Sequence, residues 1–221
     1  MVRRAARASA VALASTAVAL LAWTGVTLVW GEPVTALEAS RAQAELRTEL
    51  AQREAGWHAT AANGVAPTVG QRAMTYRRGL RGGDAIGSIV VPRLRLRTVL
   101  VEGTSATDLA RGPGHYRITA LPGLGGTVAI AGHRTTYLQP FRHIDDLKPG
   151  DRIILRMPYG TFGYVVSGHR IVDDGDWSIL RRRSYEQLVL TACHPLHSAS
   201  HRFVVFARLE STTPAGSRPP A

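Results

Sequence analysis

Cys193 is the one cysteine in a chain of 221 residues, and its neighbours in the sequence suit a reactive thiol. The apolar run of residues 188–192 leads into it, and His194 and Pro195 follow directly. Because proline ends a central strand, we expect the thiol at the end of a strand, on a rigid element beside an opening. Structural cysteines of extracytoplasmic proteins usually come in pairs. The sequence therefore favours a reactive thiol over an inert, buried one.

A base and a cation are available to activate this thiol. His133 follows the short apolar run of residues 127–131, and Arg202 opens another apolar run nine residues after Cys193. A strand–loop–strand arrangement would return Arg202 to the side of Cys193. Because thiolates form beside a base or a cationic group, we predict that His133, Cys193 and Arg202 form one catalytic constellation. Arg208 lies on the same face of its strand and is the alternative cation, but the spacing favours Arg202.

These residues stand in motifs that resemble those of the sortase family. His133 lies in Ala-Gly-His-Arg, Cys193 in Leu-Thr-Ala-Cys-His-Pro and Arg202 in His-Arg-Phe-Val-Val, in that order along the chain. The resemblance covers residues 84–209. Ala192 departs from it, because the most similar subgroup usually has threonine before the cysteine. Four further stretches are similar to that subgroup, class E of actinobacteria: residues 102–104, 112–116, 133–137 and 149–151.

The resemblance implies a fold and a reaction. The fold would be all-β, an eight-stranded sortase-type β-barrel with short helices. In the implied reaction, Cys193 attacks the Thr–Gly carbonyl of a Leu-Ala/Pro-x-Thr-Gly sorting signal and forms a thioacyl enzyme. His133 protonates the leaving amine and later deprotonates the incoming one, while Arg202 stabilises the oxyanion or holds the substrate backbone. The implied partners are secreted proteins that carry the signal and the amine of a lipid II-type peptidoglycan precursor, with no cofactor and no metal.

Four further residues are candidates for binding the sorting signal. Tyr116 and Tyr137 are candidates for contacting its alanine, and Thr191 belongs to the motif of the cysteine. Trp177 lies within residues 173–186, where sortases place a loop over the substrate groove. From the sequence, a mobile specificity loop and a plain surface connection are equally open for this segment.

The first 30 residues predict a membrane anchor. Residues 10–30 carry no charge, and about 20 apolar residues cross a bilayer as a helix. Because Arg3, Arg4 and Arg7 precede this run, the positive-inside rule places residues 1–9 in the cytoplasm and the rest outside. We therefore expect a single-pass protein of the plasma membrane with an extracytoplasmic catalytic domain. A cleaved signal peptide is the alternative, although the run is long for one.

The remainder of the chain divides into three segments. Residues 31–83 predict an extracytoplasmic helix, at 34–55, followed by a flexible linker rich in glycine, at 59–83. Residues 84–210 predict the catalytic β-barrel domain, and residues 211–221 a disordered tail. Short β-branched runs predict strands at residues 87–91, 94–100, 127–131, 152–157, 162–172, 187–193 and 202–209.

Nucleic-acid and metal-dependent functions are disfavoured. The formal net charge of +11 rests almost wholly on arginine, but the arginines are spread along the chain without a nucleic-acid motif. We therefore expect no nucleic-acid partner. His197 and His201 have the four-residue spacing of zinc ligands on a helix, but Pro195 and its small neighbours predict a loop there.

Two other functions remain as alternatives. Another wall-directed cysteine transferase or hydrolase is one, although the Ser-His-Gly-Cys signature of L,D-transpeptidases is absent from the chain. A non-catalytic β-domain that binds a wall polymer is the other. In that case Cys193 would be replaceable by alanine without loss of function, whereas a sortase would lose all activity.

Overall fold

The computed structural model describes residues 2–30, 33–60 and 67–216. Its helices are α1 (Val2–Trp30), α2 (Pro33–Thr60), α3 (Val69–Arg78) and α4 (Ala106–Arg111). Its strands are β1 (Ala85–Val91), β2 (Leu96–Glu102), β3 (Gly114–His115), β4 (Thr127–Ala131), β5 (Arg152–Met157), β6 (Gly160–Asp173), β7 (Gln187–His194) and β8 (His201–Pro214). Short 3-10 helices form at η1 (Pro92–Leu94), η2 (Ile144–Asp146) and η3 (Trp177–Leu180).

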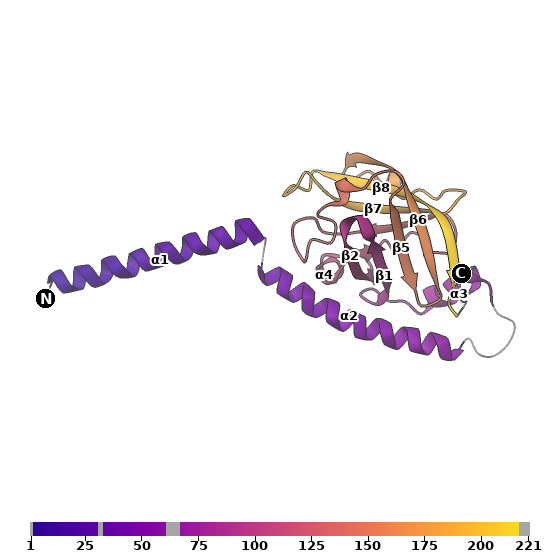
Figure 1. Cartoon of the computed structure of the whole chain (residues 1–221), viewed down its shortest axis with the longest axis horizontal. Helices are drawn as coiled ribbons and strands as arrows, with labels where there is room; N and C mark the ends of the chain where they lie inside the picture. The colour runs from indigo at the N-terminus through magenta and orange to yellow at the C-terminus, as the bar shows by residue number, and fades with distance from the viewer. Residues whose placement is uncertain (1, 31–32, 61–66, 217–221) are drawn as a thin grey trace.

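The strands close into a barrel (Figure 1). Their order around the barrel is β1-β2-β3-β4-β7-β8-β6-β5. Most neighbours are antiparallel, but β2 pairs with β3 and β4 pairs with β7 in parallel. The expected eight-stranded β-barrel is therefore confirmed. The strands predicted at residues 127–131 and 152–157 coincide with β4 and β5. The two-residue strand β3 was not predicted, because two residues show no alternation.

Alternation along the strands separates an inner from an outer face of the barrel wall. Leu188 and Leu190 of β7 join Phe203 of β8 in the central core. Val189 of β7 points the other way, as successive strand residues do. It packs outside the wall in a second cluster, whose other buried members are Ala129, Val172, Ile179 and Val204. The wall made by β4, β7 and β8 therefore carries a covered outer face as well as a buried inner one.

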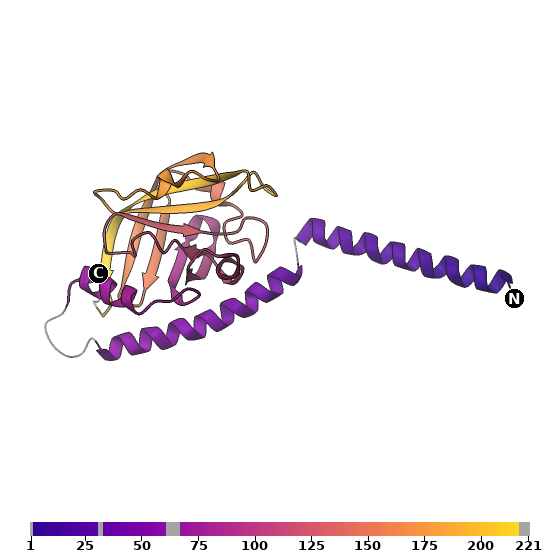
Figure 2. The ribbon, with the colours of Figure 1, turned by 180° about the vertical axis from the view of Figure 1, so that it is seen from behind.

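Helix α2 lies along the outside of the barrel against β1, β2 and α4 (Figure 2). Gln43 on this helix is buried, and its amide donates to the carbonyls of Val99 (3.1 Å) and Arg111 (2.8 Å). Its carbonyl oxygen accepts from the Val99 N–H (2.9 Å). Leu46 and Leu50 bury apolar surface beside it. The predicted helix at 34–55 is thus confirmed, in a longer form that is fixed to the barrel.

The segment predicted as a flexible linker, residues 59–83, contains a helix, so that prediction is wrong for α3. A capping box starts the helix: the Thr68 hydroxyl accepts from the Gln71 N–H (3.2 Å), and the Gln71 side chain accepts from the Thr68 N–H (2.8 Å). Ala73 and Tyr76 are then buried in the barrel core. Packing of these two side chains outweighs the flanking glycines, which dominated the prediction from composition.

The predicted disordered tail, residues 211–221, is wrong for its first part. β8 continues to Pro214, where Thr213 pairs with Thr161 and Pro214 with Gly160 of β6. The long partner strand β6 supplies a pairing edge that overrides the local Pro/Ser/Gly composition. Residues 61–66 of the expected linker and 217–221 of the expected tail lie outside the described residues.

The uncharged run of residues 10–30 lies within α1. Inside this helix the hydroxyls of Thr16 and Thr24 donate to the carbonyls of Ala12 (2.9 Å) and Leu20 (2.8 Å), one turn earlier. Judged by length and apolar character together, none of the helices in the described ranges qualifies as a membrane span.

Candidate active site

Cys193 lies at the end of β7 and faces Arg202 of β8. The two residues are partners in the antiparallel β7–β8 ladder, so their Cβ atoms lie about 5 Å apart on one face of the sheet. Nη1 of Arg202 donates to the carbonyls of Ala199 (2.8 Å) and His201 (3.0 Å). The strand register therefore places Arg202 beside Cys193, as the strand–loop–strand interpretation predicted, and the loop carbonyls hold its guanidinium.

The thiol is on the outer face of the barrel wall. Ala192 belongs to the central core, so alternation turns Thr191 and Cys193 outwards. Val189, on the same outer face, packs against Ile179 of η3. Cys193 itself is half-buried. The site is therefore a feature of the outer surface of β7 and β8, beneath the loop that contains η3.

Parallel pairing brings His133 to the same end of the wall. β4 pairs with β7 so that Ala131 lies opposite Thr191, and the Gly132 N–H donates to the Thr191 carbonyl (3.0 Å). His133 follows Ala131 by two residues, just as Cys193 follows Thr191. Because paired strands lie about 4.8 Å apart, His133 and Cys193 emerge from neighbouring strand ends.

The glycine before His133 has a packing reason. A Cβ on Gly132 would lie 2.5 Å from the ring of Phe141, which is fully buried. The Phe141 N–H in turn donates to the His133 carbonyl (3.0 Å). The loop that follows His133 therefore folds back over its own start, and only glycine leaves room for the ring that it encloses.

The imidazole of His133 is half-buried against an aromatic ring. Its centre lies 5.1 Å from that of the Tyr137 ring. Tyr137, Leu138 and Gln139 have φ angles of 50°, 63° and 49°, in the left-handed region that costs energy for residues other than glycine. Burial lowers the pKa of His133 below its ordinary value of 6.5. The imidazole is therefore mainly neutral at pH 7 and able to accept a proton.

Three of the four substrate-binding candidates meet beside the thiol. The Tyr116 hydroxyl and the Thr191 Oγ1 are 3.1 Å apart. The Tyr116 ring meets the Trp177 ring edge to face, with centres 6.4 Å apart, and Trp177 remains 63% exposed. The fourth candidate, Tyr137, lies on His133 instead. Together these side chains give the outer face next to Cys193 an aromatic wall and a hydroxyl.

Two buried polar groups near the site were not assigned a role from the sequence. Nδ1 of His115 lies 2.9 Å from a carboxylate oxygen of Glu102, and its Nε2 lies 3.0 Å from the Ala120 carbonyl. This pair supports the chain just before Tyr116. Arg134, next to His133, is 2% exposed. His115 and Arg134 both stand in the quoted motifs, but their burial depends on contacts with neighbouring strands and loops that local sequence does not show.

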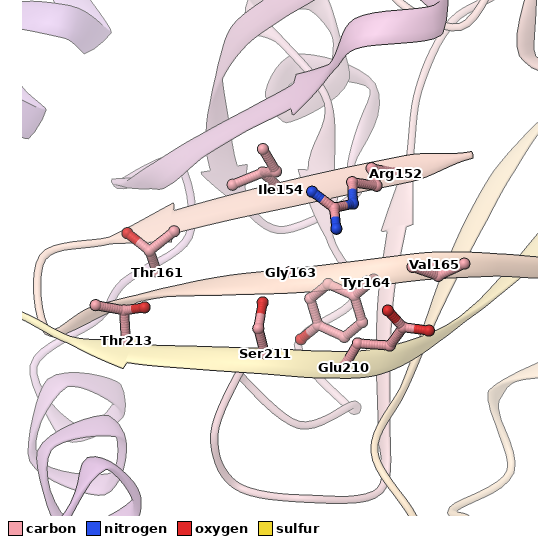
Figure 3. A pocket seen from close by; sticks show the side chains of 9 residues that line it. All are labelled: Arg152, Ile154, Thr161, Gly163, Tyr164, Val165, Glu210, Ser211 and Thr213. Atoms are coloured by element: carbon pink, nitrogen blue, oxygen red, sulfur yellow. The ribbon is translucent and has the colours of Figure 1, made fainter. Parts of the chain in front are cut away.

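A hollow of the described surface lies away from Cys193. This hollow of about 240 Å³ is formed by β5, β6 and β8. In Figure 3, Arg152 of β5 and Glu210 of β8 reach towards β6, which lies between these two strands. Its lining residue Ser211 is nine residues along β8 from Arg202, or roughly 30 Å for an extended strand. Among the described residues, no group of three or more His, Cys, Asp or Glu side chains is placed to hold a metal ion.

The burial of His133 predicts an altered titration. An NMR titration of the histidine ring protons should give a midpoint below 6.5 for His133. Since the folded state then binds fewer protons than the unfolded state, His133 opposes folding increasingly as the pH falls below 6.5. Tyr137→Ala exposes the ring to water and should raise the midpoint towards 6.5, whereas Tyr185→Ala should not. A wild-type midpoint at 6.5 or above would contradict the assignment.

Comparison with known proteins identifies the domain. The family model for the sortase domain matches residues 89–210, more than half of the chain. Sortase D of Bacillus subtilis (strain 168) is 35% identical over 130 residues, which cover 57% of this chain and 64% of that protein. Sortase SrtE1 of Streptomyces coelicolor is 28% identical over 154 residues, which cover 62% of this chain and 44% of that protein. The matched region thus spans less than two thirds of either relative.

Solved structures agree with the sequence match. The Sortase D5 transpeptidase of Clostridium perfringens superposes with a TM-score of 0.58 and 26% identity, over 64% of this chain and 88% of that one. Sortase E from Streptomyces avermitilis gives a TM-score of 0.56 and 33% identity, over 63% of this chain and 98% of that one. With the barrel, the cysteine at the end of β7 and these matches in place, the chain belongs to the sortase family of cysteine transpeptidases.

Proposed function

We propose that this protein cuts a Leu-Ala/Pro-x-Thr-Gly-type sorting signal between Thr and Gly and joins the cut protein to an amine of a cell-wall precursor. The observation that carries the proposal is the meeting of Cys193, Arg202 and His133 at the ends of three adjacent strands. All three residues lie within the stretch that matches the sortase domain.

In the first half-reaction, Sγ of Cys193 attacks the threonine carbonyl carbon and the Thr–Gly C–N bond breaks. The neutral imidazole of His133 takes the thiol proton and passes it to the leaving glycine amine. Arg202 donates hydrogen bonds to the oxyanion, or to the substrate backbone beside it. The products are a thioacyl group on Cys193 and a fragment that begins with glycine.

In the second half-reaction, an amine of a lipid II-type peptidoglycan precursor attacks the thioester carbonyl. His133 removes the proton that the amine loses as the new C–N bond forms, and the thiolate of Cys193 leaves and regains a proton. The result is an amide between the secreted protein and the wall precursor. Its two substrates are therefore a secreted protein that carries the signal and the precursor that supplies the amine.

The aromatic wall beside Cys193 is the proposed binding site for the signal. Tyr116, with its hydroxyl directed to Thr191, borders the thiol on the outer face, and the exposed ring of Trp177 extends that border. The ring of Tyr137 lies next to His133. The motif of residues 112–116 supports class E selectivity, which means a preference for Leu-Ala over Leu-Pro in the signal.

Peptide cleavage tests this proposal. The full chain in mild detergent should cut a quenched Leu-Ala-x-Thr-Gly peptide between Thr and Gly, faster than the Leu-Pro-x-Thr-Gly peptide. Cys193→Ala should abolish cleavage, and Arg202→Lys should lower kcat by about 100-fold, because one donor group replaces a planar fork at the oxyanion.

The matched control is Arg208→Lys on the same face of the same strand. Arg208 stacks over the Tyr185 ring at 4.4 Å, so its replacement should leave kcat within about twofold. Cleavage that survives in Cys193→Ala would exclude the enzyme mechanism. Equal losses in the two arginine variants would exclude a special role for Arg202.

We also propose that residues 10–30 anchor the protein in the plasma membrane by a single pass, with residues 1–9 in the cytoplasm and the barrel outside. The support is the absence of charge from this run and the three preceding arginines at positions 3, 4 and 7. An anchor of this kind would hold the site close to precursors that are carried by membrane lipids.

Alkaline extraction of membranes from producing cells tests the anchor. The full chain should stay in the pellet after a carbonate wash, because a spanning helix resists extraction, whereas a chain that begins at Pro33 should be released. Protease added to intact protoplasts should digest the barrel. Recovery of the full chain in the supernatant, or a barrel protected in intact protoplasts, would contradict the proposed placement.

A further inference from the structure

Arg134 is a buried cation that the proposed reaction does not use. Its side chain is 2% exposed, although arginine is almost never fully buried unless it is paired. Nη2 forms an ion pair with Oδ1 of Asp145 at 2.8 Å, and Nε and Nη2 both donate to the Arg142 carbonyl at 3.3 Å. The guanidinium carbon lies 6.0 Å from the centre of the Phe203 ring. Because the Arg134 guanidinium is buried and paired in this way, its position is fixed.

The other end of the guanidinium reaches the strand that carries the thiol. Nη1 of Arg134 donates to the Cys193 carbonyl at 3.4 Å and lies 3.3 Å from Nδ1 of His194. Arg134 therefore joins the loop after His133, the η2 turn and the end of β7. Arg134 directly follows His133 in the sequence. Its hydrogen bond to the Cys193 carbonyl therefore links the backbone next to His133 to the backbone of Cys193.

The same guanidinium also orients the His194 ring. Because a guanidinium carries only donors, Nδ1 of His194 is the acceptor in this contact. Arg134 therefore holds the side chain that follows Cys193 as well as the Cys193 carbonyl.

His133 needs such a support. Within the part of the chain that the structure describes, its imidazole lies against the ring of Tyr137, and no hydrogen bond orients it. The position of the ring is therefore set by the backbone at residues 133–134. On the β4 side this backbone is fixed by the Gly132 N–H at the Thr191 carbonyl (3.0 Å), and beyond it by Arg134.

We propose that Arg134 is a positioning residue that sets the separation of the His133 imidazole and the Cys193 thiol, by clamping the backbone of the base to the carbonyl of the nucleophile. This inference rests on the proposed function for its effect on turnover. The planar guanidinium is essential to this role, because it contacts Asp145, the Arg142 carbonyl and the Cys193 carbonyl at the same time. A lysine ammonium at the same place is a point charge that reaches fewer of these partners.

The test compares Arg134→Lys with Arg142→Lys in the full chain. Arg142 lies in the same loop, but its side chain donates to Gln139 (3.0 Å), and only its backbone carbonyl serves Arg134. Arg134→Lys should lower kcat for peptide cleavage by about 100-fold, the effect of a misplacement of about 1 Å, with KM changed by less than about twofold. Arg142→Lys should keep both constants within about twofold.

A second readout does not depend on the substrate. Alkylation of Cys193, the one thiol in the chain, by iodoacetamide at pH 7 should slow in Arg134→Lys and not in Arg142→Lys, because the base no longer lies at the thiol. If the wild type cuts no peptide but this difference in alkylation is present, the proposed function fails and the positioning role stands. Equal alkylation rates together with an unchanged kcat would overturn the positioning role.

Thermal unfolding separates positioning from stability. The kinetic comparison is made well below the Tm of every variant, so a purely structural role would leave kcat unchanged there. If Arg134→Lys does not fold, Asp145→Asn decides, because Asp145 is 47% exposed and tolerates an isosteric change. Asp145→Asn should lower kcat by about tenfold with KM and Tm nearly unchanged. An unchanged kcat in this folded variant would overturn the proposal.

Discussion

The parallel pairing of β4 with β7 is the constraint on which the rest of the site depends. This pairing joins the strands β1 to β4 to the other four strands of the barrel. It places Ala131 opposite Thr191, so His133 and Cys193 lie at neighbouring strand ends. The antiparallel pairing of β7 with β8 then adds Arg202. Because side chains alternate along a strand, a slip of one residue would turn Cys193 into the core. The core packing of Leu190 and Ala192 in β7 therefore also determines that Cys193 lies on the outer face of the barrel wall.

The side chains of the site also differ in how deeply they are buried. His133 is half-buried beside Tyr137, which lowers its pKa and keeps it a proton acceptor at neutral pH. Arg202 is half-buried, and its guanidinium is held by carbonyls of the loop between β7 and β8. Arg134 is buried and paired with Asp145. The two arginines near Cys193 thus differ in environment: loop carbonyls hold Arg202, whereas Arg134 is buried in an ion pair.

The sequence predicted what local pattern encodes and missed what distant contacts decide. Strand alternation and turn residues located β4 and β5 at their observed bounds, and strand–loop–strand reasoning placed Arg202 beside Cys193. The helix α3 was missed because glycines surround it and its stability comes from burial of Tyr76 in the barrel. The burial of Arg134 could not be predicted either, because its partners Asp145 and Cys193 are 11 and 59 residues away in the sequence.

Trapping of the thioacyl intermediate tests the central claim most directly. The full chain is mixed with a Leu-Ala-x-Thr-Gly peptide, quenched in acid within the first turnover and digested for mass spectrometry. The account predicts the Leu-Ala-x-Thr acyl group, attached through a thioester, on the fragment that contains Cys193. Hydroxylamine should release it, and Arg202→Lys should reduce its yield. Peptide cleavage without any adduct on Cys193, and with full activity in Cys193→Ala, would contradict the account.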